Sequence, residues 1–192
     1  MPPRGRGLRI VAGVCGGQRI EVSAGTRPTI DRVRAAMFDS LGQAPPDRVL
    51  DCYAGSGALG LEALSRGSEF VRFIDSSGRA ISAIEANLQR LGLETSARVD
   101  RANVLRADLA LGGPFGLVFA DPPYASDPWP CLMEILTQPK VITADGGIVA
   151  EFSSRRVPPD PPSGWFISKT RRHGDSTFAI YRGDHAIRTS LS

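Results

Sequence analysis

The sequence of 192 residues lacks the residues from which disulfide frameworks and zinc sites are built. Its three cysteines, Cys15, Cys52 and Cys131, lie far apart and form no C-x-x-C pair. Only two histidines are present, one in "RRHGD" and one in "GDHAI". This pattern argues against a disulfide scaffold and against a metal centre, and it fits a reducing cytoplasm.

Long apolar runs are also missing. No stretch is long and apolar enough to span a bilayer, and the start, "MPPRGRGLRIVAG", has no apolar signal-peptide core. Hydrophobic residues make up 42% and charged residues 22%, which is ordinary for a globular protein. We therefore expect a soluble cytoplasmic protein with one α/β domain and a small appendage.

Lysine is scarce, since only Lys140 and Lys169 occur, and most of the positive charge is arginine. The net charge is +3 and the pI about 9.0, but residues 1–34 carry seven arginines against one Glu and one Asp. A basic front end suggests an anionic partner, with nucleic acid the leading candidate. A solvated, arginine-rich surface would give the same composition, so composition alone leaves both interpretations open.

The N-terminal part has a hairpin and a helix as its predicted elements. "LRIVAGVCGGQRIEV" indicates two short β segments around the Gly16–Gly17 pair. "IDRVRAAMFDSL" has helical spacing, with Thr29 or Asp31 available as a cap, and "GQAPPD" then breaks the chain. We predict a boundary there, between an N-terminal extension over residues 1–46, comprising a basic tail, hairpin and helix, and a main domain over 47–192.

From Arg48 onward the pattern alternates between strands and helices. The strands are expected in "RVLDCYA", "EFVRFID", "ARVDRA", "FGLVFA" and "GGIVAEF", and the helices in "ALGLEALSRG", "GRAISAIEANLQRLG" and "DPWPCLMEILTQ". A proline-rich loop at 157–163 precedes a closing hairpin that turns at Gly174–Asp175. The alternation predicts a mainly parallel, twisted, Rossmann-like sheet with helices on both faces and an antiparallel hairpin at its edge.

A glycine-rich loop follows the first of these strands. "DCYAGSGALG" contains Gly55-x-Gly57-x-x-Gly60, and Asp75 ends the next strand, at the spacing of a ribose-binding acid. NAD and S-adenosylmethionine both fit such a loop. Asp51 favours S-adenosylmethionine, because a carboxylate there could take its amino group but would repel a pyrophosphate, and Asn103 could bond an adenine edge. No hydride-transfer pattern such as Tyr-x-x-x-Lys is present, so an NAD-linked oxidoreductase is the less favoured alternative.

The stretch "FADPPYA" contains the second candidate motif. The prolines end the apolar strand directly after Asp121, so the chain must leave the sheet where this acid lies. An exocyclic amine on a base is a poor nucleophile and must be turned toward a methyl donor. The Asp121 carboxylate and the Pro122 carbonyl, fixed by Pro123, could accept its two hydrogens. The Tyr124 ring could stack on the flipped base. The motif therefore favours methyl transfer to a planar amine.

These residues carry a resemblance to a known family. "DPPY" and "LDCYAGSGALGLEALSRG", with "GTRPTIDRVRAAMFDSL" and the terminal "HGDSTFAIYR", resemble the RsmD family over about Leu8 to Arg182. The resemblance implies a class I S-adenosylmethionine-dependent methyltransferase fold and methylation of N2 of a guanine in bacterial small-subunit (16S) ribosomal RNA. The RNA would be free or within a partly assembled 30S particle, and we expect a monomer.

The same resemblance assigns the site residues. The positions expected to line the cofactor are Asp51, Tyr53, Gly55, Gly57, Leu59, Asp75 and Asn103. By the same resemblance Arg27, Thr29 and Arg32 would bind the substrate, residues 1–46 would serve RNA recognition and residues 47–192 methyltransferase catalysis. Arg9 and Arg19 are expected to bind the substrate too, because basic side chains supply phosphate contacts. In the family a Glu followed two residues later by Asp comes after the second strand, whereas this chain has Asp75 and Ser77.

Three other functions stay open at this point. DNA amino-methyltransferases share "DPPY" but usually carry a separate target-recognition domain, for which this chain has no room. A protein-glutamine methyltransferase would use similar acceptors around an amide. A catalytically silent RNA-binding module would not need the Asp121–Tyr124 motif.

Overall fold

A computed structural model describes residues 8–22, 31–42, 44–123 and 127–184 of the chain. Its centre is a seven-stranded sheet with the order β3-β2-β1-β4-β5-β7-β6. The strands are β1 (Arg48–Cys52), β2 (Phe70–Asp75), β3 (Ala97–Arg101), β4 (Phe115–Ala120), β5 (Ile142–Ser153), β6 (Trp165–His173) and β7 (Ser176–Gly183). Among the described residues, no helix has the length and apolar character needed to cross a bilayer.

The five strands β1 to β5 pair in parallel, whereas β7 lies antiparallel between β5 and β6. The predicted α/β class, the mainly parallel sheet and the closing hairpin are therefore confirmed. The chain order reverses between β1 and β4, which are neighbours although β2 and β3 lie between them in sequence. In open sheets of this kind, ligands bind outside the carboxyl ends of the strands near such a reversal.

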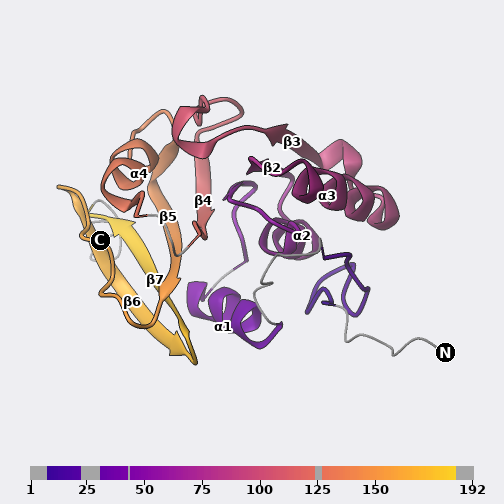
Figure 1. Ribbon diagram of the computed structural model, residues 1–192, viewed down its shortest axis with the longest axis horizontal. Helices are drawn as coiled ribbons and strands as arrows, with labels where there is room; N and C mark the ends of the chain where they lie inside the picture. Colours follow the sequence, from indigo (N-terminus) through magenta and orange to yellow (C-terminus); the bar gives the residue numbers. More distant parts are fainter. Residues whose placement is uncertain (1–7, 23–30, 43, 124–126, 185–192) are drawn as a thin grey trace.

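The helices cover both faces of the sheet. Helices α1 (Asp31–Leu41), α2 (Ala58–Ser65) and α3 (Gly78–Leu91) lie on one side, and α4 (Trp129–Leu136) lies on the other (Figure 1). Two short 3-10 turns, η1 (Glu94–Ser96) and η2 (Val104–Arg106), flank β3. Each face has its own apolar cluster, one containing Phe73 and Phe119 and the other Ile74 and Val118, as alternation along a strand requires.

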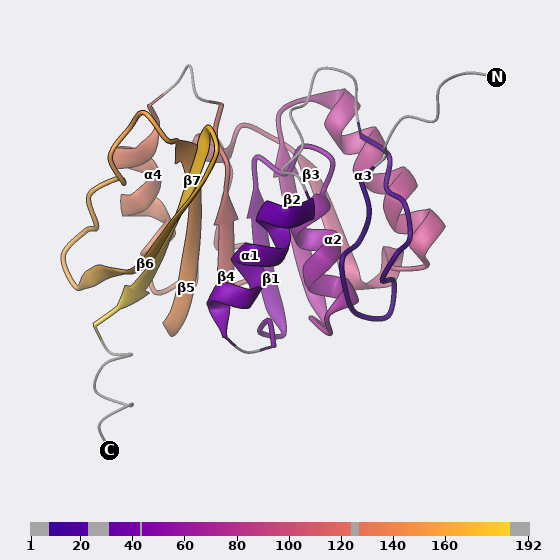
Figure 2. The same ribbon diagram turned by 90° about the horizontal axis from the view of Figure 1, so that it is seen from below.

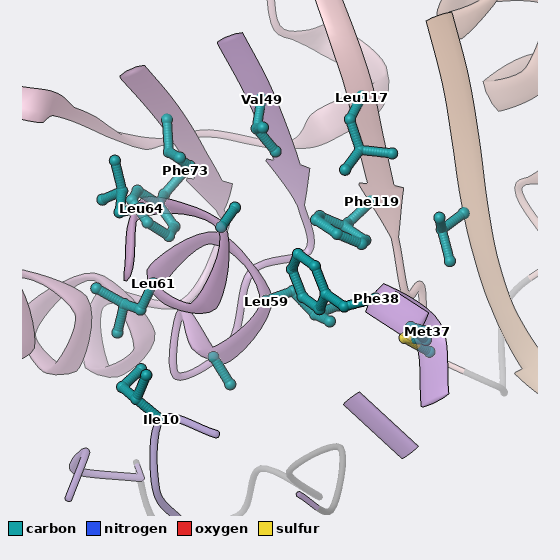
Figure 3. Close-up of a cluster of buried hydrophobic side chains, with 14 of the residues drawn as sticks. Ile10, Met37, Phe38, Val49, Leu59, Leu61, Leu64, Phe73, Leu117 and Phe119 are labelled. Atoms are coloured by element: carbon teal, nitrogen blue, oxygen red, sulfur yellow. The ribbon is translucent and has the colours of Figure 1, made fainter. Parts of the chain in front are cut away.

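Close packing against the sheet explains one glycine of the loop motif. A Cβ on Gly60 would lie only 2.2 Å from Cε1 of Phe73, so α2 can approach β2 closely because this position has no side chain. On the same face, the ring of Phe38 from α1 lies 5.5 Å from that of Phe119 on β4 (Figure 3). These contacts hold α1 and α2 against the strands that carry the predicted site.

The N-terminal hairpin is fixed to α2 by one buried carboxylate. Glu62 accepts hydrogen bonds from the backbone N–H groups of Val11 (2.7 Å) and Ala12 (3.0 Å). It also accepts from Nε of Arg34 (3.2 Å) and of Arg66 (2.7 Å). Every oxygen of this buried acid is thus matched by donors.

The other end of the hairpin is fixed to α3. The Asn87 amide accepts from the Glu21 N–H (2.7 Å) and donates to the Glu21 carbonyl (3.0 Å). It also donates to the Ser56 carbonyl in the glycine loop (3.2 Å). This buried side chain therefore joins the hairpin directly to the glycine loop.

Most predicted elements occur where the sequence placed them, with differences in extent. The hairpin of residues 8–22 has a single antiparallel bridge, Arg9 with Arg19, and backbone hydrogen bonds from Ile10, Gly17 and Ile20 cross it on either side of that bridge. Strand β5 begins at Ile142, ahead of the predicted "GGIVAEF", because Ile142 already pairs with Phe115 of β4. Gly92 ends α3 in the left-handed conformation (φ 69°), as the sequence suggests. The possible cap Thr29 lies outside the described residues.

Candidate active site at the carboxyl edge of the sheet

A row of polar side chains follows the carboxyl ends of the parallel strands. The strand register sets Cys52 beside both Ile74 and Ala120, and Ala120 beside Ala150. Four carboxylates and one amide therefore lie on five neighbouring strands or directly after them, in the order Asn103, Asp75, Asp51, Asp121 and Glu151. Residues far apart in sequence meet here because the parallel strands end at the same edge.

The glycine loop leaves β1 through a strained turn. Tyr53 has a positive φ of 58°, a conformation that side chains other than glycine rarely adopt. Gly55 (φ 56°) and Gly57 (φ 76°) follow it in the same region, where glycine is free of strain. Strain of this kind occurs where the surrounding structure fixes a backbone for function, so Tyr53 and the two glycines fit the predicted cofactor loop.

Asp75 holds the glycine loop and the start of α3 together. Its Oδ2 accepts from the Gly55 N–H (2.9 Å) and its Oδ1 from the Ser77 N–H (2.8 Å). The Ser77 hydroxyl in turn caps α3 by accepting from the Ala80 N–H. Each Asp75 oxygen keeps a further lone pair for a ligand hydroxyl. Asp75, which is one methylene shorter than the Glu usual in the family, therefore fixes the loop and stays compatible with the predicted ribose contact.

Asp51 is buried at the end of β1. Its Oδ2 accepts from the Gly60 N–H at 2.9 Å, which attaches the strand to the first turn of α2. Burial, together with the nearby negative charge of Asp75, raises the Asp51 pKa to about 8 although the Gly60 hydrogen bond opposes the rise. A carboxylate so poorly compensated by the protein is suited to receive a cationic group from a ligand.

Asp121 follows β4 and is only partly exposed, next to a buried Pro122 and an exposed Pro123. Desolvation raises its pKa well above the ordinary value, and the charges of Glu151 and Asp51 raise it further. Once ionised, such a carboxylate is a strong hydrogen-bond and proton acceptor. Tyr124, the fourth residue of the predicted motif, lies outside the described residues.

Glu151 is a member of the row that the sequence analysis missed. It is buried on β5, one position beyond the Ala150 that pairs with Ala120, and so lies beside Asp121. The available signal was the same as for Asp121, an acid at the end of an apolar run, here in "GGIVAEF". Without the register, nothing showed that this strand adjoins β4.

The other predicted residues are distributed more widely. Asn103 is exposed after β3, and its Oδ1 accepts from the Leu105 N–H (3.0 Å), so the amide nitrogen is the group that could serve as a donor to a ligand. The Leu59 side chain packs in the core beneath the loop. Arg9, Arg19 and Arg32 are exposed, the first two on the hairpin and the third on α1. Arg27 and Thr29 lie outside the described residues.

The charge of the row limits which ligands can bind. Several carboxylates at one edge, one of them buried with a raised pKa, disfavour an added pyrophosphate and favour a cationic ligand. S-adenosylmethionine carries a sulfonium and an amino group, whereas NAD carries two phosphates. The geometry therefore supports the first ligand over the second.

Comparison with known proteins gives matches over nearly the whole chain. The family model described as Conserved hypothetical protein 95 matches residues 8–182. YlbH of Bacillus subtilis is 33% identical over 181 residues, covering 91% of this chain and 98% of that protein. Ribosomal RNA small subunit methyltransferase D of Escherichia coli K12 is 32% identical over 178 residues, covering 91% of this chain and 89% of that protein.

A solved structure has the same fold. The yhhF protein of Escherichia coli superposes with a TM-score of 0.81 and is 30% identical, covering 92% of this chain and 97% of that one. The match includes both the sheet and the N-terminal region, since only a small part of either chain is left out.

Proposed function

The chain belongs to the family described as Conserved hypothetical protein 95, the RsmD family, and on that basis we propose that it methylates small-subunit ribosomal RNA. The methyl donor is S-adenosylmethionine, and the acceptor is the exocyclic N2 amine of a guanine. The observation that carries the proposal is the row of acids at the carboxyl edge, with Asp121 directly after β4 beside the strained glycine loop.

The cofactor side of the reaction uses the first half of the row. Asp51 pairs with the amino group of the methionine moiety, and Asp75 accepts the ribose hydroxyls while it holds the Gly55 N–H. Asn103 hydrogen-bonds an adenine edge. The cofactor is also lined by residues of the glycine loop and the start of α2, namely Tyr53, Gly55, Gly57 and Leu59. Cationic groups of the cofactor compensate the buried Asp51 carboxylate and thereby favour its ionised form.

The acceptor side uses the Asp-Pro-Pro-Tyr motif. Asp121 and the Pro122 carbonyl accept the two amino hydrogens, so the nitrogen lone pair points at the methyl group, while Tyr124 stacks on the base. The nitrogen forms a bond to the methyl carbon as the carbon–sulfur bond breaks. The resulting cationic amine then releases one proton, which Asp121 is placed to accept.

The rest of the chain supplies the RNA contacts in this proposal. Residues 1–46 recognise RNA, with Arg9, Arg19, Arg27, Thr29 and Arg32 as contacts, and residues 47–192 carry out catalysis. The enzyme acts in the cytoplasm as a monomer, on free RNA or on a partly assembled 30S particle.

The test is methyl transfer from labelled S-adenosylmethionine to small-subunit RNA, free and in its protein-bound particle, followed by nucleoside analysis. Label in N2-methylguanosine is expected. Label in another nucleoside would contradict the guanine-N2 assignment and keep the methyltransferase. No label in either substrate, despite cofactor binding, would contradict the RNA substrate and redirect the test to DNA and to protein glutamine.

A further inference from the structure

Two arginine pairs that are distant in sequence lie at the same end of the sheet as the candidate active site. Arg155 and Arg156 follow β5, and Arg171 and Arg172 stand near the end of β6. In the sheet, Ser153 of β5 and His173 of β6 both pair with Ser176 of β7. The two pairs therefore lie near the same end of β7, with Arg171 and Arg172 on opposite faces of the sheet because neighbours in a strand alternate, and we refer to the four residues as the arginine cluster.

Hydrogen bonds hold this arrangement in place. The Ser154 N–H donates to the Asp175 carbonyl (2.8 Å), and the Ser154 hydroxyl donates to the Gly174 carbonyl (3.0 Å). Nε of Arg172 donates to the same Gly174 carbonyl (3.3 Å). The segment after β5 is thus attached to the β6–β7 turn, and the cluster is part of a built surface.

The cluster lies at the same edge as Asp121. Strands β5 and β6 are both antiparallel to β7, which lies between them, so their carboxyl ends point the same way. The three strands form one side of the molecule (Figure 2). Ser153 is three residues beyond Ala150, which pairs with the last residue of β4, a distance of about 10 Å along the strand. Arg156 also forms an ion pair with Asp127 (3.3 Å), just after the Asp-Pro-Pro-Tyr motif.

The charges of the cluster are largely uncompensated. All four arginines are exposed, and neither Arg155 nor Arg171 forms an ion pair with another described residue. The acids identified beside them are Asp127, paired with Arg156, and Asp175 in the turn. Guanidinium groups match phosphate oxygens in shape and charge, which favours a phosphate ligand.

We infer that the arginine cluster binds phosphates of the substrate RNA on the β6 side of the target guanine. This inference rests on the proposed function. The N-terminal hairpin packs on α2 and α3, on the other side of Asp121 from β6, so the two basic regions flank the reacting position. An RNA strand that delivers a flipped base to Asp121 continues on both sides of that base. The arginine cluster binds the phosphates on one of these two sides.

The test compares Arg155→Gln/Arg171→Gln with the matched control Arg98→Gln/Lys140→Gln, which removes two exposed charges near the amino ends of β3 and β5. RNA affinity is measured over a salt series with the protein saturated with S-adenosylhomocysteine, and kcat and KM are measured on free RNA and on the particle. We expect the cluster variant to weaken RNA binding at least about tenfold and to lower the salt slope by about 1 to 2. Its kcat at saturating RNA and its cofactor affinity are expected to match the wild type.

Other results would overturn the inference. Equal RNA affinity and salt slope in the cluster and control variants would do so, while wild-type methylation of RNA would leave the proposed function standing. A defect confined to the protein-bound particle would assign the cluster to an acidic ribosomal protein. If the wild type methylates no RNA, the proposed function fails, and the cluster is then decided by the binding comparison alone.

Discussion

Two buried acids in this molecule, Glu62 and Asp51, differ in how many donors offset the loss of water around the carboxylate. Glu62, between the hairpin and α2, accepts from two backbone N–H groups and from two arginines, Arg34 and Arg66. Asp51, at the carboxyl edge, has one N–H partner, from Gly60, and its pKa rises to about 8. The difference separates an acid that holds the fold together from one that our proposal assigns to ligand binding.

The physical reason lies in the cost of burying a charge. A buried carboxylate is tolerated when donors replace the lost water, and Glu62 meets this condition within the protein. Asp51 at the carboxyl edge has fewer donors than Glu62, so its ionised form is unfavourable in the protein alone. A cationic ligand can stabilise that ionised form. Removing Glu62 should therefore damage stability, and removing the site acids should damage function.

The largest expected effect follows from Asp121→Ala. This change removes the acceptor that turns the amine and takes its proton, so kcat is expected to fall by about a thousandfold or more. RNA and cofactor binding are expected to persist, as equilibrium binding would show. The control is Asp145→Ala, an exposed acid on β5. Wild-type turnover by Asp121→Ala would contradict the role of Asp121 as acceptor of the amino hydrogens and the proton.

The next effect is on stability. Glu62→Gln places an amide among donors and removes a charge from beside the buried Arg34, so the free energy of unfolding is expected to fall by about 3 kcal/mol. Denaturant unfolding measures the change, with the exposed Glu85→Gln on α3 as control. A loss no larger than that of the control would mean that the hairpin anchor contributes little to folding.

The smallest effect is the pH dependence of Asp51→Asn. The Asp51 pKa rises from 3.8 when unfolded to about 8 when folded, so between these values the folded state holds a proton that the unfolded state has lost. Stability of the wild type without ligand therefore falls as the pH rises through this window. Asparagine keeps the oxygen that accepts from the Gly60 N–H and removes the titration. Its advantage in unfolding free energy should grow by about 2 kcal/mol from about pH 6.5 to about pH 8.5.

Cofactor binding completes this comparison, because the same variant should bind S-adenosylmethionine about tenfold more weakly if Asp51 pairs with its amino group. Titration calorimetry at neutral pH measures that loss. The prediction would be contradicted if the unfolding free energy of Asp51→Asn ran parallel to that of the wild type across this pH range and its cofactor affinity were unchanged. Asp51 would then be, like Glu62, an acid that only holds structure.

The sequence predicted much of the fold because its signals are local. Gly92 after an amphipathic run ends α3, and the prolines after Asp121 end β4, through backbone preferences that need no distant partner. The glycines of the loop and the acids Asp51, Asp75 and Asp121 were found for the same reason, since each follows an apolar strand directly. Whether they bind the predicted ligand groups stays a prediction.

What only the tertiary structure decided is which distant residues meet. The place of β4 beside β1, and of β7 between β5 and β6, arises from packing and strand pairing between segments far apart in sequence. That order brings Glu151 beside Asp121 and the segment after β5 to the β6–β7 turn, while the packing of α2 sets Glu62 against the hairpin. Sequence alone determined the kinds of groups and the elements that carry them. Which of these groups become neighbours was decided by the register of the sheet, because register is set by non-local contacts.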